Sequence, residues 1–277
     1  MTAGRGTLRK LALGVIAMGA LAQLVSGCGP RQPPPARIRY VTHRAEKSFG
    51  DCGGGGAQCT RIKLRWPEVL EAPNTAVKES LSVFIRTCLL QPYDGGAPLT
   101  SADSVMARFI AAYRAFVAES LSIPTVPWKF ERTIALLGDT LGVASAAVTE
   151  WSFLGGAHPN STTRLANFEI ASGHALRPSD LLLGTARAQL DSLGEQAFRR
   201  VRRLPPGADL GTAGFMFKTG RFQLNDNMAV TRTGLIFFFN EYEIGPHALG
   251  ATEIALPWSE VRDYVRIERP LGPRAGP

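Results

Sequence analysis

The stretch KFERTIALLGDTLGVASAAVTEWSF, residues 129–153, decides the fold because its apolar residues tend to recur at every second position. Such a period is typical of a β-strand with one buried face. Residues 129–137 and 140–153 are predicted to be antiparallel strands joined by the turn dipeptide Gly138-Asp139. One face of the second strand carries Leu141, Val143, Ala147 and Trp151. This hairpin therefore predicts an antiparallel sheet in the middle of the chain.

Helices are predicted on both sides of the hairpin, at 74–90, 101–120 and 178–203, where apolar residues recur every three or four positions. The residues expected to face inward are Val77, Leu81, Phe84, Ile85 and Cys88 in the first helix, Val105, Phe109, Tyr113, Phe116 and Val117 in the second, and Leu190, Leu193, Ala197 and Val201 in the third. Further strands are predicted at 60–66, ended by Pro67, and at 162–170, 228–232, 235–240 and 253–257. Antiparallel strands interrupted by helices, without a regular βαβ alternation, indicate the α+β class.

The first 27 residues have the layout of an export signal, because three basic residues precede an uncharged stretch at 11–27. The apolar part is shorter than the roughly 20 residues that cross a bilayer, so a retained membrane span is not expected. The tetrad Val25-Ser26-Gly27-Cys28 resembles a bacterial lipobox. This resemblance implies cleavage before Cys28 and acylation of that cysteine. An ordinary secretory signal with a coincidental cysteine is the alternative.

The chain after the signal is predicted to hold one domain. Residues 28–45, from the acylated cysteine through a proline-rich run, are expected to be an extended tether. The domain follows at 46–265, with a helix-rich part at 46–125 and a sheet-rich part at 126–265, and 266–277 is a flexible tail. Gly29 after the cysteine favours the periplasmic face of the outer membrane as the location.

Charge excludes one class of partner. Removal of residues 1–27 takes away three positive charges and leaves 28 Lys and Arg against 23 Asp and Glu, a net charge of +5. Such a mildly basic balance does not indicate nucleic-acid binding, and no nucleic-acid partner is expected.

Three cysteines remain for the exported domain, an odd number for an oxidising compartment. Cys52 and Cys59 flank the glycine-rich segment GGGGAQ, which is flexible enough to let their sulfur atoms meet, so a Cys52–Cys59 disulfide is predicted. A bridge from either of them to Cys88, or no bridge, is the alternative. No histidine lies at finger-like spacing from the pair, so no zinc site is expected, and no other metal or cofactor is predicted.

Two segments carry a resemblance to a known family. They are WSFLGGAHP, residues 151–159, and FQLNDNMAVTRTGLIFFFNEYEIGPHALGATEIALPW, residues 222–258. Together they resemble the domain of unknown function shared by RsiV-type anti-sigma factors and PdaC-type peptidoglycan deacetylases. The shared pattern is a Gly-Gly-Ala-His turn and, further on, an apolar strand followed by Tyr-Glu-Ile-x-Pro. The resemblance implies an antiparallel β-sheet with helices packed on one side.

Candidate binding residues come from these two segments and are Gly155, Gly156, His158, Asn160, Tyr242, Glu243 and His247. In this hypothesis the glycine turn is a ligand cradle and Tyr242-Glu243 is a polar lip on a groove. The alternative is structural, with the imidazole of His158 bonded to nearby backbone and the tyrosine at a strand end. No catalytic residue is predicted. A wall hydrolase or deacylase that uses His158 with Glu243 or Glu150 is the enzymatic alternative.

The predicted function is non-catalytic binding or sensing at the cell envelope. We find no counterpart of the sigma-binding segment and membrane span of an RsiV-type regulator, or of the deacetylase domain of a PdaC-type enzyme. The expected partners are the membrane, through the lipid anchor, and peptidoglycan or a wall-active periplasmic protein. A basic lysozyme is disfavoured because like charge removes electrostatic steering. A structural subunit of an envelope complex is a further alternative, and the sequence does not indicate an oligomeric state.

Overall fold

The computed structural model of the chain describes residues 37–52, 58–119 and 126–266. The predicted signal, the acylation site at Cys28 and nearly all of the predicted tail lie outside the described residues. Residues 35–277 form one compact unit, and both hydrophobic cores lie wholly within it. This part of the chain therefore contains the apolar burial that it needs to fold by itself.

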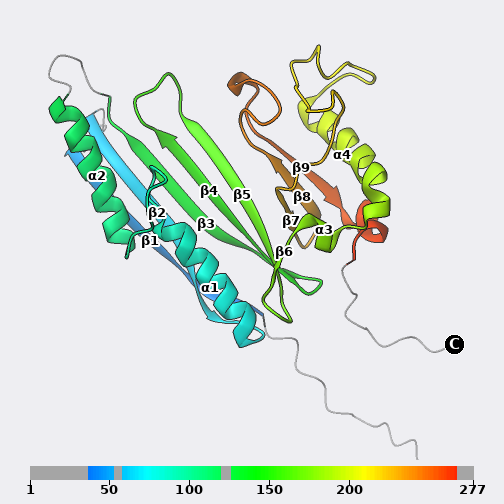
Figure 1. Cartoon of the computed structure of the whole chain (residues 1–277), viewed down its shortest axis with the longest axis horizontal. Helices are drawn as coiled ribbons and strands as arrows, with labels where there is room; N and C mark the ends of the chain where they lie inside the picture. The colour runs from blue at the N-terminus through cyan, green and yellow to red at the C-terminus, as the bar shows by residue number, and fades with distance from the viewer. Residues whose placement is uncertain (1–36, 53–57, 120–125, 267–277) are drawn as a thin grey trace, which may run out of the picture. The chain divides into compact units, whose positions relative to one another are not determined.

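The described strands form two sheets, one of six strands in the order β1-β2-β3-β4-β5-β6 and one of three in the order β7-β8-β9 (Figure 1). Their bounds are β1 Arg39–Asp51, β2 Gln58–Glu71, β3 Lys129–Thr140, β4 Val143–Phe153, β5 Asn160–Glu169, β6 Ala175–Leu176, β7 Met228–Val230, β8 Gly234–Phe239 and β9 Thr252–Pro257. The longer helices are α1 Thr75–Leu90, α2 Ala102–Glu119 and α4 Arg187–Arg202, and the short ones are α3 Pro178–Leu181, α5 Trp258–Val261, η1 Gly184–Ala186, η2 His247–Leu249 and η3 Arg262–Tyr264. The predicted α+β class is confirmed, although one pair, β2 with β3, is parallel.

The central hairpin is present as β3 and β4, but its turn lies elsewhere than predicted. Thr140 pairs with Val143, so the turn residues are Leu141 and Gly142, and both have positive φ, 55° and 79°. Two positive φ values define the type I′ turn, whose twist matches that of the flanking strands. The predicted turn residue Gly138 instead lies at a register shift in β3. Leu137 is left without a partner there, as in a β-bulge, and the strand continues to Thr140 before the chain turns.

Helices α1 and α2 cover the β1 end of the larger sheet and share a core with it (Figure 1). Asn74 starts α1, since its side-chain oxygen accepts the N–H of Val77 at 3.0 Å. The predicted inward face of α1 is buried, with Phe84 only partly so. In α2 the last two predicted positions, Phe116 and Val117, are exposed, although the ring centroid of Phe116 lies 5.2 Å from that of Trp128.

Strand β1 begins at Arg39, so the prediction of a tether as far as residue 45 is wrong for its last seven residues. These residues are extended, as expected, but they pair with residues 64–71 of β2. Strand β2 also continues past Pro67, which was predicted to end it. A proline is tolerated there because β3 pairs with β2 only as far as Arg65. Beyond Arg65, no carbonyl group of β3 requires a backbone N–H from β2.

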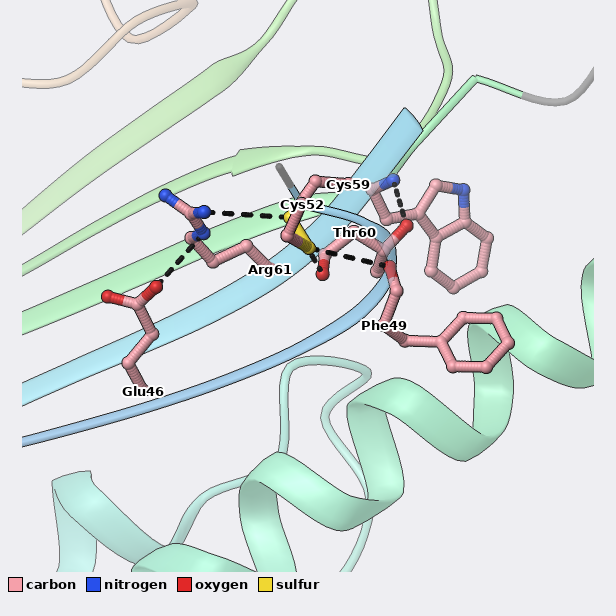
Figure 2. Close-up of a disulfide and its surroundings, with 7 residues drawn as sticks. Glu46, Phe49, Cys52, Cys59, Thr60 and Arg61 are labelled. Atoms are coloured by element: carbon pink, nitrogen blue, oxygen red, sulfur yellow. Dashed lines mark hydrogen bonds and ion pairs between the residues drawn. A yellow bond between two sulfur atoms is a disulfide. The ribbon is translucent and has the colours of Figure 1, made fainter. Parts of the chain in front are cut away.

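A disulfide joins Cys52 to Cys59 at the end of this long pair of strands, as predicted (Figure 2). Arg61 lies beside the bridge, with Nη2 3.6 Å from the sulfur of Cys59 and Nε 3.0 Å from the carboxylate of Glu46 on β1. Cys88 is free and buried in α1. The alternative bridges to Cys88 are therefore excluded.

Helix α4 packs on the three-stranded sheet and forms a second core with it. The single helix predicted at 178–203 is divided into α3, η1 and α4, because Leu182 interrupts it by forming a bridge to Val265. Val201, predicted to face inward, is 52% exposed, and Phe198 is buried in its place. No helix in the described ranges combines the length and apolar character needed to cross a membrane.

Candidate functional site

The edge of β5 is joined to the small sheet by side chains instead of by a neighbouring strand. The backbone N–H groups of Ser161, Thr163 and Leu165 donate to side-chain oxygens of Glu241, Asn240 and Asn227, at 3.1, 2.7 and 2.8 Å. In the opposite direction, the N–H of Val230 in β7 donates to Asn167 of β5 at 2.9 Å. We call Asn167, Asn227, Asn240 and Glu241 the amide junction. It satisfies an edge that would otherwise leave N–H groups unpaired.

The Gly-Gly-Ala-His turn lies next to this junction, between β4 and β5. Gly155 has φ of +81°, a conformation that favours glycine, and a Cβ there would meet Trp128 at 3.7 Å. The turn brings His158 to the start of β5. Its Nδ1 lies 3.0 Å from the carbonyl oxygen of Pro159, and its Nε2 lies 3.0 Å from the hydroxyl of Tyr242.

His247 completes the cluster from the other side. Its ring stacks on that of His158, with centroids 3.6 Å apart and planes 21° apart. Its Nε2 lies 3.1 Å from the carbonyl oxygen of Pro159 and 3.3 Å from a carboxylate oxygen of Glu241. Segments about 80 residues apart in sequence therefore meet in one place.

The hydrogen bonds assign the protons when both rings are neutral. The carbonyl oxygen of Pro159 can only accept, so His158 carries its proton on Nδ1 and His247 on Nε2. The Nε2 of His158 is then an acceptor, and the hydroxyl of Tyr242 donates to it.

Tyr242 is the exposed member of this cluster. Its φ is +64°, an uncommon value for a residue other than glycine, asparagine or aspartate, and 59% of its surface is exposed. The hydroxyl is held by His158, so the ring has a fixed position although it faces solvent. A strained, exposed and fixed aromatic side chain is the kind of outlier that suggests a functional role.

Two predicted binding residues are not part of the cluster. Glu243 accepts the N–H of Asn240 at 2.8 Å and the side-chain amide of Asn225 at 2.7 Å, which closes the turn after β8. The side chain of Asn160 forms no hydrogen bond within the described ranges. Glu241 is a member that sequence reasoning missed. The only feature of the sequence that could have indicated Glu241 is its position among the polar residues that flank the two strands of the second signature segment.

The enzymatic alternative needs His158 beside Glu243 or Glu150, and the structure brings neither pair together. Glu150 accepts a hydrogen bond at 2.7 Å from Arg132, a buried side chain.

The thiol of Cys88 lies near this ion pair. Burial raises the pKa of the Cys88 thiol, although Arg164 at 2.8 Å lowers this pKa. Among the described residues, no three His, Cys, Asp or Glu side chains converge to hold a metal ion.

The fold and the site define an α+β protein whose two sheets meet at a polar cluster. Residues 179–259 match the family described as "Protein of unknown function (DUF3298)", so a DUF3298 domain is present in the chain. The match contains the second signature segment and not the first. No curated protein matches the chain.

Two solved structures have the same fold. A member of the DUF3298 family from Bacteroides fragilis superimposes with a TM-score of 0.62 at 16% identity, covering 82% of this chain and 93% of that one. A DUF3298 family protein from Pseudomonas aeruginosa gives a TM-score of 0.58 at 17% identity, covering 84% and 96%. Because the similarity extends over most of each chain, the first part of this protein shares their fold as well.

Proposed function

We propose that this protein is a lipid-anchored binding module of the bacterial cell envelope, without catalysis, and that it recognises a cell-wall glycan. A wall-active periplasmic protein is the second candidate ligand. The resemblance of both signature segments to RsiV-type and PdaC-type domains supports the envelope context. The exposed ring of Tyr242, fixed on His158 at the meeting point of those segments, is the observation that carries the binding role.

The geometry of the cluster around Tyr242 suits sugar binding better than it suits catalysis. An exposed aromatic ring offers an apolar face to the C–H groups of a pyranose, while neighbouring polar atoms fix the orientation of the ligand. The carboxylates that a catalytic role would need are engaged elsewhere, Glu243 by Asn240 and Asn225, and Glu150 by Arg132. The ring is also positioned before any ligand arrives, which lowers the entropic cost of binding.

Binding is tested with residues 35–277 and purified peptidoglycan sacculi. We expect saturable retention that is reduced about tenfold or more by Tyr242→Ala, and reduced less by Tyr242→Phe, which keeps the ring but loses the hydroxyl. Tyr40→Ala is the matched control because Tyr40 is an exposed tyrosine on β1. Absence of retention, or equal loss in the control, would contradict the glycan proposal. Capture of one periplasmic protein that depends on Tyr242 would favour the second candidate.

The anchor is tested separately in the full chain expressed in a bacterial host. We expect incorporation of labelled fatty acid and membrane fractionation, both lost in Cys28→Ser. A chain that is exported and cleaved but carries no label would show an ordinary secretory signal instead.

A further inference from the structure

Two arginines face each other on the first two strands, and neither has an acidic partner among the residues that the structure describes. Arg44 on β1 pairs directly with Arg65 on β2, and both are exposed. Their neighbour Leu64 is buried in the core under α1 and α2. Because side chains alternate along a strand, Arg65 and its cross-strand partner point to the sheet face away from these helices.

The arrangement is unfavourable by itself. Like charges directly opposite each other on antiparallel strands destabilise a sheet. Neither guanidinium forms a hydrogen bond or ion pair within the described ranges. The carboxylates nearby are already used, since Glu46 pairs with Arg61 at 3.0 Å and Glu131 pairs with Lys63 at 3.1 Å.

The two arginines border an open hollow of about 420 Å³ on the surfaces of β1, β2 and β3. Thr133 of β3 is in register with Arg65 and also lines it. Two guanidinium forks and a hydroxyl at one place can surround a tetrahedral oxyanion with charge-assisted hydrogen bonds.

We propose that Arg44 and Arg65, with Thr133, bind the phosphate of an anionic phospholipid headgroup, so that this face of the β1–β2 pair rests on the membrane. A soluble phosphate compound would present the same phosphate group to this site as a lipid headgroup does. Bound phosphate would remove the repulsion between the two arginines, which nothing within the described chain does.

The membrane is the favoured source of phosphate because of where the strand begins. Arg39 follows Cys28 by 11 residues. Even fully extended, these residues span at most about 40 Å. An acyl anchor at Cys28 therefore holds β1 close to the bilayer surface. This step rests on the lipid anchor of the proposed function.

The experiment measures binding of residues 35–277 to vesicles of phosphatidylglycerol and phosphatidylcholine, and to vesicles of phosphatidylcholine alone. We expect binding to the anionic vesicles, about tenfold or more weaker in Arg44→Gln/Arg65→Gln. The matched control is Arg200→Gln/Arg203→Gln, which removes two exposed charges at the end of α4. This control should bind nearly as well as the unmodified protein. Thermal melts of all variants should be similar and would show that folding is intact.

Each other outcome overturns the proposal. Undiminished vesicle binding by Arg44→Gln/Arg65→Gln, or equal loss in the control, would show that net charge alone attracts the protein. A thermal shift with inorganic phosphate, without vesicle binding, would assign the site to a soluble phosphate compound. Failure is distinguishable from failure of the glycan proposal, because Tyr242→Ala should still bind vesicles and the arginine variant should still bind sacculi.

Discussion

Cys88 shows how burial overrides a neighbouring charge at the scale of one residue. The residue is 4% exposed, and its thiol lies 2.8 Å from the guanidinium of Arg164, which by itself would favour the thiolate. Loss of hydration is the larger effect and raises the pKa of the thiol above its ordinary value of 9.0. The folded protein therefore holds Cys88 as a neutral thiol, packed as a small apolar side chain.

This raised pKa predicts a fall in stability at high pH. Below pH ~9 the thiol is protonated in both states and its contribution is fully present. As the pH rises through the unfolded pKa toward the folded one, the unfolded chain loses the proton first and becomes favoured. Above pH ~9 we expect the free energy of unfolding, measured with urea, to depend less on pH for Cys88→Ala than for the unmodified protein. Identical slopes would contradict the prediction.

At the scale of elements, Arg132 joins two strands of the large sheet to the end of a helix. This buried side chain of β3 donates to the carbonyl oxygens of Leu89 and Gln91, at 3.2 and 2.5 Å, and to Glu150 of β4 at 2.7 Å. It thereby satisfies two carbonyl groups at the C-terminus of α1, where the last carbonyl groups of a helix have no partner within the helix. A positive charge is also favourable at that helix end.

Arg132→Met should therefore lower the free energy of unfolding by about 3–5 kcal/mol, because it leaves Glu150 and the helix carbonyls without their partner. Lys63→Met is the control, since it removes an exposed ion pair on the neighbouring strand, with side chains 43% and 51% exposed. That loss should be about 0–1 kcal/mol. Chemical denaturation measures both. A loss for Arg132→Met no larger than that of the control would show that the buried network contributes little.

The amide junction predicts a second cost at this scale. Asn227 accepts the N–H of Leu165 and donates to the carbonyl oxygens of Thr163 and Phe238. Asn227→Ala should lower the free energy of unfolding by about 1–3 kcal/mol, because it leaves partly buried backbone groups unsatisfied. Asn160→Ala is the control, since Asn160 lies at the start of the same strand and its side chain forms no hydrogen bond in the described ranges. This variant should change the free energy of unfolding by less than about 0.5 kcal/mol. Equal effects would argue against the junction.

At the scale of the whole domain, the second core depends on residues outside the family match. It includes Val143 of β4, and Leu176, Tyr264 and Val265 pack against it. All four lie outside residues 179–259. The β5 backbone groups that the amide junction satisfies, at Ser161, Thr163 and Leu165, lie outside that range as well. The matched region therefore lacks part of its own core.

We accordingly expect residues 179–259, expressed alone, not to fold. Near-ultraviolet circular dichroism and amide dispersion in NMR spectra measure this, with residues 35–277 as the folded reference. A fragment that melts cooperatively with dispersed amide signals would show that the contacts with β4 and β5 are dispensable.

Local pattern in the sequence was enough to find most elements. The period of two placed the β3–β4 hairpin, the stripes of three and four placed α1 and α2, and the glycine segment indicated the Cys52–Cys59 disulfide. These features depend on residues close together in the chain. The predicted position of the hairpin turn was wrong because Gly138 and Gly142 each offer a possible turn site. The choice between them depends on the register of β3 with β4 along the full length of both strands.

The candidate site was found in part, since its members come from two recognisable segments. His158, Tyr242 and His247 do meet, yet Glu241 and the role of Glu243 in closing a turn were not foreseen. The N–H group that Glu241 accepts belongs to a strand 80 residues earlier. No local pattern encodes such a pairing.

The sequence by itself determined the α+β class, the disulfide and the faces that α1 buries, because periodicity and flexible spacing act over a few residues. Only the tertiary structure decided the parallel pairing of β2 with β3, the buried position of Arg132, the amide junction and the placement of Arg44 opposite Arg65. Each of these depends on which strand lies beside which, and that choice is made by packing between distant segments.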